Sequence, residues 1–324
     1  MEDEPTCLVA CCDIGGTKVA LALVDAEGRV LARDRYLLGI EREPEQVLTR
    51  ARERLHALAA GSELPWHDVA GVGCSVAGRL DPSRETVSSC TVGDWLHVPF
   101  RSLLQDAFGL PVWMEMDACA GALGEAWLGE GQGVADFIYV AVGTGIGAGI
   151  RLSGGMYHGW HGTAGEIGHT VIDPDGPRCY CGSHGCLEAL ASGPAIALRA
   201  RQAIESGHQT MMPGLAANGE ITAMTVFEAA RAGDGVALDI VHETAQYLGI
   251  GLANLVNLLN PEVIALAGGV IEGGTDMLLD PVRMEVQSRC GHRPGLEGTR
   301  IVAATLGQDA PLVGVAYLVY QGLR

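Results

Sequence analysis

The chain has 324 residues, 48% of them apolar, and a formal net charge of −18. That length exceeds what one hydrophobic core usually supports, so we expect two lobes of ordinary size. The acidic charge, with no basic run to offset it, argues against a nucleic-acid surface. The N-terminus MEDEPT is acidic and the longest apolar run, 137–150, is too short and glycine-rich to cross a bilayer, so we expect no export and no membrane span.

Cysteine and lysine usage add two constraints. The ten cysteines include neighbours at 11 and 12 inside an apparent strand, which suits reduced thiols in a cytosol better than a disulfide framework. We therefore expect a cytoplasmic protein. Lys18 is the single lysine among 21 basic residues, and it lies in a glycine loop where a compact charge beside phosphates would be useful. Chance placement is the alternative.

The first elements form a hairpin pattern that recurs later in the chain. An apolar strand at 7–12 leads through DIGGTK into a second strand, the turn AEGR and a third strand. Residues 137–157 repeat this plan. The repeat predicts a duplicated fold with one nucleotide-gripping turn in each lobe.

Helices and further strands follow each hairpin. We expect a helix within 41–60, a strand over 69–80, a short helix over 100–108, and the strand VWMEM running directly into a helix from Asp117. From Ser192 onward the chain is mostly helical. The expected elements there are a long helix over 234–260, a strand at 263–269, a helix over 281–290, a strand at 299–305 and a last helix from Asp309. The alternation predicts an α/β protein of two lobes around a cleft, where ligands bind.

Residues 162–188 combine a soft ligand set with two carboxylates, Glu166 and Glu188. The candidate ligands are His169, Cys179, Cys181 and Cys186. Three thiolates and an imidazole meet the tetrahedral demand of Zn²⁺, and glycines at 182 and 185 let the loop turn tightly. Four protein ligands would close the site, which indicates a structural zinc. Buried free cysteines or a redox CxC pair are the alternatives.

The two glycine turns are candidate phosphate-binding loops. Backbone N–H groups of DIGGTK (13–18) and GTGIG (143–147) could cradle a polyphosphate from both lobes, because glycine leaves room for close approach. Asp13 could hold Mg²⁺ through water, and Lys18 could face the phosphates. Each turn alone is also compatible with an ordinary tight turn.

Taken together, these motifs resemble the ROK family, the sugar kinases and repressors of the actin-like ATPase superfamily, over essentially the entire chain. The shared motifs occur in the family's order: DIGGTK, LGE at 123–125, GTGIG, AGEIGH at 164–169, CxCGxxGCLE at 179–188 and AGG at 267–269. The resemblance implies a two-lobed actin-like ATPase (ribonuclease H-like) fold with an interlobe cleft and a structural zinc loop. Residues 1–116 and 308–324 would form the small lobe, and 117–307 the large one.

The resemblance also implies an activity and its residues. It implies ATP-dependent phosphorylation of a hexose or modified hexose, such as glucose or an amino or acetamido sugar, at the 6-hydroxyl. Asp117 would be the general base, although an aspartate there is also a common helix N-cap. Glu166, His169 and Glu188 would bind sugar hydroxyls, with His169 serving zinc through its other ring nitrogen; solvated glutamates are the alternative. The nucleotide-binding residues would be Asp13, Gly15, Gly16, Thr17, Lys18, Gly143, Thr144, Gly145, Gly268 and Gly269, with ATP, Mg²⁺ and Zn²⁺ as cofactors.

The chain departs from the family pattern on one side of the expected sugar pocket. Met116 and Cys119 flank Asp117 and Ala118 where family glucokinases usually carry Asn-Asp-Ala-Asn, and Thr91 replaces a further asparagine. Ala77 stands in place of a usual proline. We expect Thr91 and Met116 to contact the substrate. Each unpaired buried polar group costs about 1–3 kcal/mol, so glucose recognition should weaken, and an amino, acetamido or deoxy hexose would fit better.

Two other functions stay open. The lost asparagines are compatible with a non-catalytic sugar sensor that acts through a protein partner. We expect no DNA-binding domain, because the first strand begins near Cys7, and no nucleic acid or membrane partner. A structural or chaperone-type ATPase would leave the zinc loop unexplained. Family kinases imply a homo-oligomer, either a dimer or a tetramer.

Overall fold

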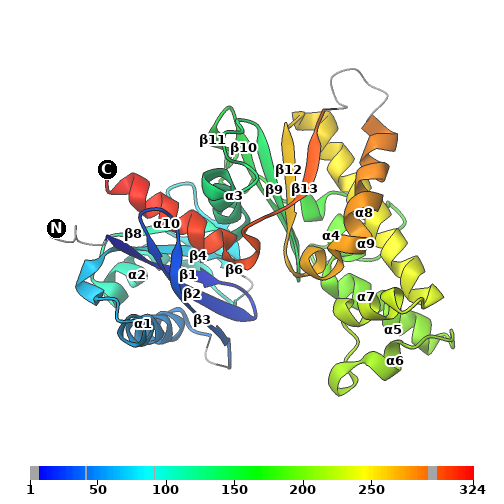
Figure 1. The fold of residues 1–324 in the computed structure, drawn as a ribbon, viewed down its shortest axis with the longest axis horizontal. Helices are drawn as coiled ribbons and strands as arrows, with labels where there is room; N and C mark the ends of the chain where they lie inside the picture. Colours follow the sequence, from blue (N-terminus) through cyan, green and yellow to red (C-terminus); the bar gives the residue numbers. More distant parts are fainter. Residues whose placement is uncertain (1–6, 41, 91, 291–297) are drawn as a thin grey trace.

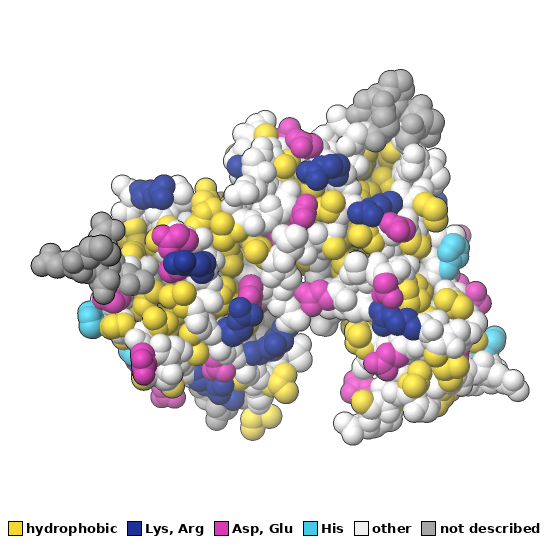
Figure 2. Space-filling model, in the orientation of Figure 1, with side chains coloured by type: hydrophobic (Ala, Val, Ile, Leu, Met, Phe, Trp, Pro, Cys, Tyr) yellow, Lys and Arg dark blue, Asp and Glu magenta, His cyan; other side chains and the backbone are white. Residues whose placement is uncertain are grey.

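The computed structural model describes residues 7–40, 42–90, 92–290 and 298–324, arranged as two lobes side by side (Figure 1). Thr91 lies outside the described residues. The surface is hollowed between the two lobes on one side of the molecule (Figure 2). Among the described residues, no helix is both long and apolar enough to span a membrane.

Each lobe is built on one five-stranded sheet. The small-lobe sheet has the order β3-β2-β1-β4-β8, and its strands are β1 (Leu8–Ile14), β2 (Lys18–Asp25), β3 (Val30–Leu37), β4 (Val69–Val76) and β8 (Val112–Met116). The large-lobe sheet has the order β11-β10-β9-β12-β13, and its strands are β9 (Phe137–Val142), β10 (Ile146–Leu152), β11 (Gly155–Met156), β12 (Val263–Ala267) and β13 (Arg300–Ala303). In both sheets the first strand pairs antiparallel with the second and parallel with a later strand. This shared order confirms the predicted duplication.

Helices cover these sheets, and a small sheet lies beside them. The helices are α1 (Pro44–Gly61), α2 (Phe100–Phe108), α3 (Asp117–Leu128), α4 (Leu187–Ala191), α5 (Gly193–Glu205), α6 (Met212–Leu215), α7 (Ala223–Arg231), α8 (Gly235–Leu259), α9 (Gly269–Cys290) and α10 (Ala310–Gly322). Short 3₁₀ turns are η1 (Trp66–Asp68), η2 (Ile167–His169), η3 (Ala217–Gly219) and η4 (Gly307–Asp309). The small antiparallel sheet joins β5 (Gly78–Leu80), β6 (Val87–Cys90) and β7 (Leu96–Val98).

Helices α3 and α10 cross closely between the two sheets (Figure 1). Two glycines permit this approach, because a Cβ on Gly124 would clash with the carbonyl of Ala310, and a Cβ on Gly314 would clash with that of Ala120. Helix α10 also packs on β1 and β4, whereas α3 packs on β9 and β10. The crossing therefore couples the two lobes. The division at residues 116 and 308 stays a prediction.

Two elements differ from the expectation by more than a few residues. The strand expected over 69–80 divides into β4 and β5, which belong to different sheets. The helix expected at 281–290 begins at Gly269, bends at Gly274 and contains Pro281. Its glycine-rich first half is helical because Val270, Ile271 and Leu278 bury their side chains in the large-lobe core, and burial outweighs weak helix propensity.

Candidate functional site

One carboxylate is fixed against the glycine turn between β9 and β10. Glu188 lies in the first turn of α4, and its Oε2 accepts a hydrogen bond of 2.7 Å from the N–H of Ile146. A Cβ on Gly145 would lie 2.6 Å from the same oxygen, so a side chain there would push the carboxylate away from the turn. The carboxylate is 8% exposed. Glu188, a candidate ligand of a sugar hydroxyl, is thus held against a candidate phosphate-binding turn.

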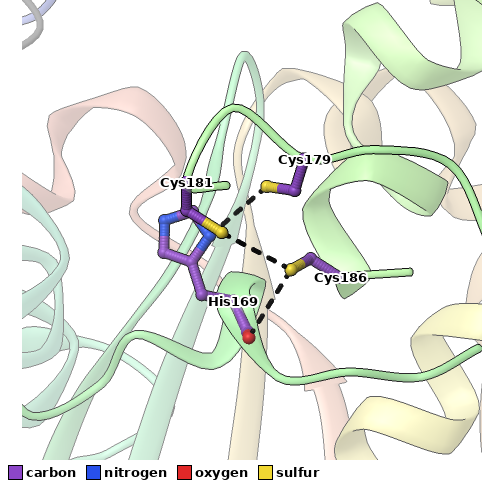
Figure 3. Close-up of side chains that lie close together, drawn as sticks. All are labelled: His169, Cys179, Cys181 and Cys186. Carbon is purple, nitrogen blue, oxygen red and sulfur yellow. Dashed lines mark hydrogen bonds between the residues drawn. The ribbon is translucent and has the colours of Figure 1, made fainter. Parts of the chain in front are cut away.

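The predicted zinc ligands converge (Figure 3). The Nδ1 of His169 lies 3.7 Å from Cys179 Sγ, Cys181 Sγ lies 3.7 Å from Cys186 Sγ, and all four ligand atoms lie within 4.8 Å of one another. Bonds of about 2.0–2.3 Å to a tetrahedral zinc require separations of this size. Gly182 and Gly185 have φ values of +96° and +64°, as the tight turn requires. The donor set therefore fits Zn²⁺.

The second ring nitrogen of His169 contacts side chains other than the cysteines. Its Nε2 lies 3.2 Å from the Tyr180 hydroxyl and 3.7 Å from Oε2 of Glu166. Glu166 also pairs with Arg79 of β5, with 3.1 Å between Oε1 and Nε. Sequence reasoning missed both Arg79 and Tyr180. Tyr180 could have been noticed because it stands between two ligand cysteines, whereas no pattern distinguishes Arg79.

Asp117 is the first residue of α3, directly after the sheet edge at Met116. Its Oδ1 accepts a 2.8 Å hydrogen bond from the N–H of Ala118, and Met116 occupies the N-cap. Burial, and then repulsion by Asp13, raise the pKa of Asp117 to about 7. A carboxyl group with such a pKa can accept a proton near neutral pH.

Asp13 lies in β1, and Ser75 Oγ donates a 2.7 Å hydrogen bond to its Oδ1. Burial raises the pKa of Asp13, while the Ser75 hydroxyl and the charge of Lys18 oppose that rise. Asp13 and Asp117 repel each other. A bound cation would relieve that repulsion, so this carboxylate suits Mg²⁺.

The remaining nucleotide candidates lie in three turns. Gly15, Gly16 and Thr17 connect β1 to β2, and Gly143 to Gly145 connect β9 to β10. Gly268 connects β12 to α9, which begins at Gly269. Gly268 has φ +90°, and a Cβ on it would lie 2.5 Å from the carbonyl oxygen of Val142, so glycine is required there.

Gln308 joins residues from both lobes. Its Oε1 accepts hydrogen bonds from Lys18 Nζ at 3.2 Å and from Arg35 Nη1 at 2.8 Å. Its Nε2 donates to Glu272 Oε2 of α9 at 2.9 Å. Sequence reasoning identified Lys18 but missed Gln308 and Glu272, because nothing in the chain order brings the three together.

The altered side of the expected sugar pocket is apolar. Met116 is 7% exposed and Cys119 is 1% exposed, and both belong to the small-lobe core. The contact of Met116 with substrate, like that of Thr91, stays a prediction.

Comparisons with known proteins agree with this architecture. The model of the ROK family matches residues 9–322. A glucokinase of Halalkalibacterium halodurans is 34% identical over 313 residues, covering 95% of this chain and 94% of that protein. A solved ROK family glucokinase from Streptomyces griseus, in complex with glucose and AMPPNP, is 38% identical, with a TM-score of 0.83 over 97% of this chain and all of that one.

A regulator of the same family has a similar fold. The solved ROK family transcriptional regulator, a homologue of the E. coli MLC protein, is 28% identical with a TM-score of 0.85, and the match covers 98% of this chain and 78% of the regulator. The chain has the two-lobed actin-like ATPase fold of these proteins and belongs to the ROK family.

Proposed function

We propose that this ATP-dependent sugar kinase transfers the γ-phosphoryl group of ATP to the 6-hydroxyl of a hexose or modified hexose, with Asp117 as the general base. The observation that carries the proposal is the bond between Glu188 and the N–H of Ile146, which fixes a hydroxyl-binding carboxylate to a phosphate-binding turn. Glucokinase relatives covering almost the whole chain support it.

The chemistry follows from the placement of the carboxylates. A sugar hydroxyl is a poor nucleophile until a carboxylate accepts its proton. Asp117 takes up that proton while the hydroxyl oxygen forms a bond to the γ-phosphorus and the bond to the leaving ADP oxygen breaks. Glu166, His169 Nε2 and Glu188 accept or donate hydrogen bonds to the remaining hydroxyls and hold the ring in place.

The nucleotide lies against the three glycine turns and Lys18 in this proposal. Mg²⁺, held by Asp13 through water, would neutralise charge on the phosphates. The zinc bound by His169 and three cysteines is structural, because four protein ligands leave no open position. It fixes the segment between Glu166 and Glu188.

Within the proposed range of hexoses, the apolar side of the pocket favours a modified sugar. Met116 and Cys119 replace two amides, and their burial in the apolar core leaves little hydrogen bonding for a full set of hydroxyls. An amino, acetamido or deoxy hexose suits this wall better than glucose. A coupled ADP-release assay across a panel of sugars tests the proposal. No turnover with any hexose at millimolar concentration would overturn it.

A second candidate function is a non-catalytic sugar sensor. The replaced asparagines favour it, and xylose repressors are among the relatives, including one of Bacillus subtilis at 30% identity over 95% of this chain. Sugar binding by calorimetry without ADP release would select the sensor. The predicted dimer or tetramer is checked by light scattering on the same samples.

A further inference from the structure

Three side chains of different chemistry converge beside the start of α3, away from the cysteine cluster. A carboxylate oxygen of Glu115, the Sγ of Cys119 and a ring nitrogen of His158 lie within 4.8 Å of one another. Glu115 is the last residue but one of β8, Cys119 lies in the first turn of α3, and His158 follows β11. The junction of β8 and α3 therefore supplies one oxygen and one sulfur donor, and the distant segment after β11 supplies one nitrogen donor.

The separation between Glu115 and His158 fits a bound metal with little movement. His158 Nε2 lies 2.9 Å from Glu115 Oε2. A tetrahedral ion with bonds of about 2.0–2.1 Å to each would hold these atoms about 3.3 Å apart, so they need to part by only a few tenths of an ångström. The side chain of His158 is 29% exposed whereas Glu115 is 3% exposed, so an ion can enter from the histidine side.

The second oxygen of Glu115 is held by other groups. Oε1 accepts a 2.9 Å hydrogen bond from the N–H of Met116 and lies 3.3 Å from Arg84 Nη2. Arg84 thus pairs with the far oxygen and leaves Oε2 facing His158. Outer hydrogen bonds of this kind orient a carboxylate that binds a metal. One carboxylate and one thiolate balance the two charges of a divalent ion, which lowers the cost of burying it, and Arg84 keeps one positive charge beside the site.

We propose that Glu115, Cys119 and His158 form a second metal site, for a borderline divalent cation such as Zn²⁺. Sulfur, nitrogen and oxygen donors together suit Zn²⁺ rather than Mg²⁺ or Ca²⁺. Three protein ligands leave a fourth position for water or another oxygen ligand, unlike the closed site at His169. The site gives Cys119 a role besides lining the apolar wall of the proposed sugar pocket. It does not depend on the proposed phosphoryl transfer.

The opposing interpretation is a hydrogen-bonded Glu115–His158 pair with Cys119 as a space-filling thiol. The two interpretations differ in how many metal ions the chain holds. We would count zinc by mass spectrometry in the full chain purified without chelator, for the wild type, Cys119→Ala and His158→Gln. Cys290→Ala is the matched control, because that thiol is also 1% exposed and contacts the carbonyl of Ala253 at 3.6 Å.

The site predicts that Cys119→Ala and His158→Gln each hold one ion fewer per chain than the wild type, while Cys290→Ala holds the same number. Unchanged zinc in Cys119→Ala and His158→Gln would overturn the proposal. The partly exposed His158 keeps the test valid if the cysteine variant unfolds. Cobalt loading of a Cys181→Ala chain gives a second readout, because its remaining thiolate-to-metal absorption should weaken when Cys119→Ala is added.

Discussion

Arg79 and Glu166 join the small sheet of β5 to the segment of the other lobe that carries the candidate zinc ligands, with 3.1 Å between Nε and Oε1. Their side chains are 49% and 40% exposed, so water and salt screen the pair. It holds Glu166 toward the small lobe, on the side where the substrate is proposed to bind. The pair therefore favours the closed arrangement of lobes that phosphoryl transfer needs.

We expect Arg79→Gln to raise the sugar KM up to about fivefold with little change in kcat, because an exposed ion pair contributes about 0–1 kcal/mol. The effect should shrink at high salt, and steady-state kinetics at two ionic strengths measures it. Arg289→Gln, which removes an ion pair with Glu285 within α9, should leave KM unchanged. A larger effect on kcat than on KM would contradict this role.

Asp117→Asn should keep the fold and the binding of sugar and nucleotide while lowering kcat at least about 100-fold, because the amide cannot accept the hydroxyl proton. Calorimetry and the ADP-release assay separate binding from turnover. Asp106→Asn, on the exposed surface of α2, is the control. Near-normal turnover of Asp117→Asn would reject the general base.

Cys181→Ala tests the zinc loop without opening a core cavity, because Cys181 is exposed. We expect loss of one zinc and a rise of about tenfold or more in the sugar KM, since the segment bearing Glu188 loses its anchor. A selective chelator should reproduce the rise in the wild type. Cys7→Ala, at another exposed cysteine, should change neither quantity. Wild-type protein without zinc would defeat the argument.

Glu188 and Glu125 are both buried carboxylates, but only Glu188 is proposed to bind the sugar. Substituting Glu188 should therefore change the sugar KM, whereas substituting Glu125 should change the stability of the fold. Glu188→Gln should raise the sugar KM about tenfold, because the hydroxyl acceptor beside Ile146 is lost.

Glu125 provides the comparison, since its Oε1 accepts from the N–H of Leu306 at 2.7 Å and its Oε2 from the N–H of Glu130 at 2.8 Å. Glu125→Gln should lower the free energy of unfolding by about 1–3 kcal/mol with the KM unchanged. Denaturant titration and steady-state kinetics on both variants test whether Glu188 is the carboxylate that binds the sugar. A change in KM confined to Glu125→Gln would contradict that assignment.

Stability should depend on the charge of Asp234, the N-cap of α8. Burial raises its pKa, but hydrogen bonds from the N–H groups of Ala237 and Met211 and from the Thr210 hydroxyl outweigh this and lower it. The lowered pKa stabilises the fold above the unfolded value of about 3.9, and this stabilisation is lost as the pH falls through the folded pKa.

Asp234→Asn should therefore unfold more easily than the wild type at pH 7, by about 1–2 kcal/mol, and the difference should narrow in acid. Urea titrations across that pH range measure it. Asp239→Asn, on the exposed face of the same helix, is the control. If the difference in unfolding free energy between the two proteins grew in acid, the pKa of Asp234 would not be lowered in the fold.

The sequence alone determined the local elements wherever one signal dominated. The helix at Phe100–Phe108, the strand at Val112–Met116 and the junction at Asp117 match the expected bounds. The duplicated hairpins and the clustering of the four candidate zinc ligands were also predicted, because glycine turns and soft ligands are readable over short spans. The start of α9 was not, since core packing overrode its glycine-rich sequence.

Tertiary structure alone decided the contacts between distant segments. No sequence spacing marks these contacts. They are Arg79 with Glu166, Gln308 with Lys18 and Glu272, and His158 with Glu115 and Cys119. Each arises because two sheets of the same order are set against one another by the crossing of α3 and α10. The motifs fix the chemistry that each lobe supplies, while the packing between lobes fixes which side chains meet.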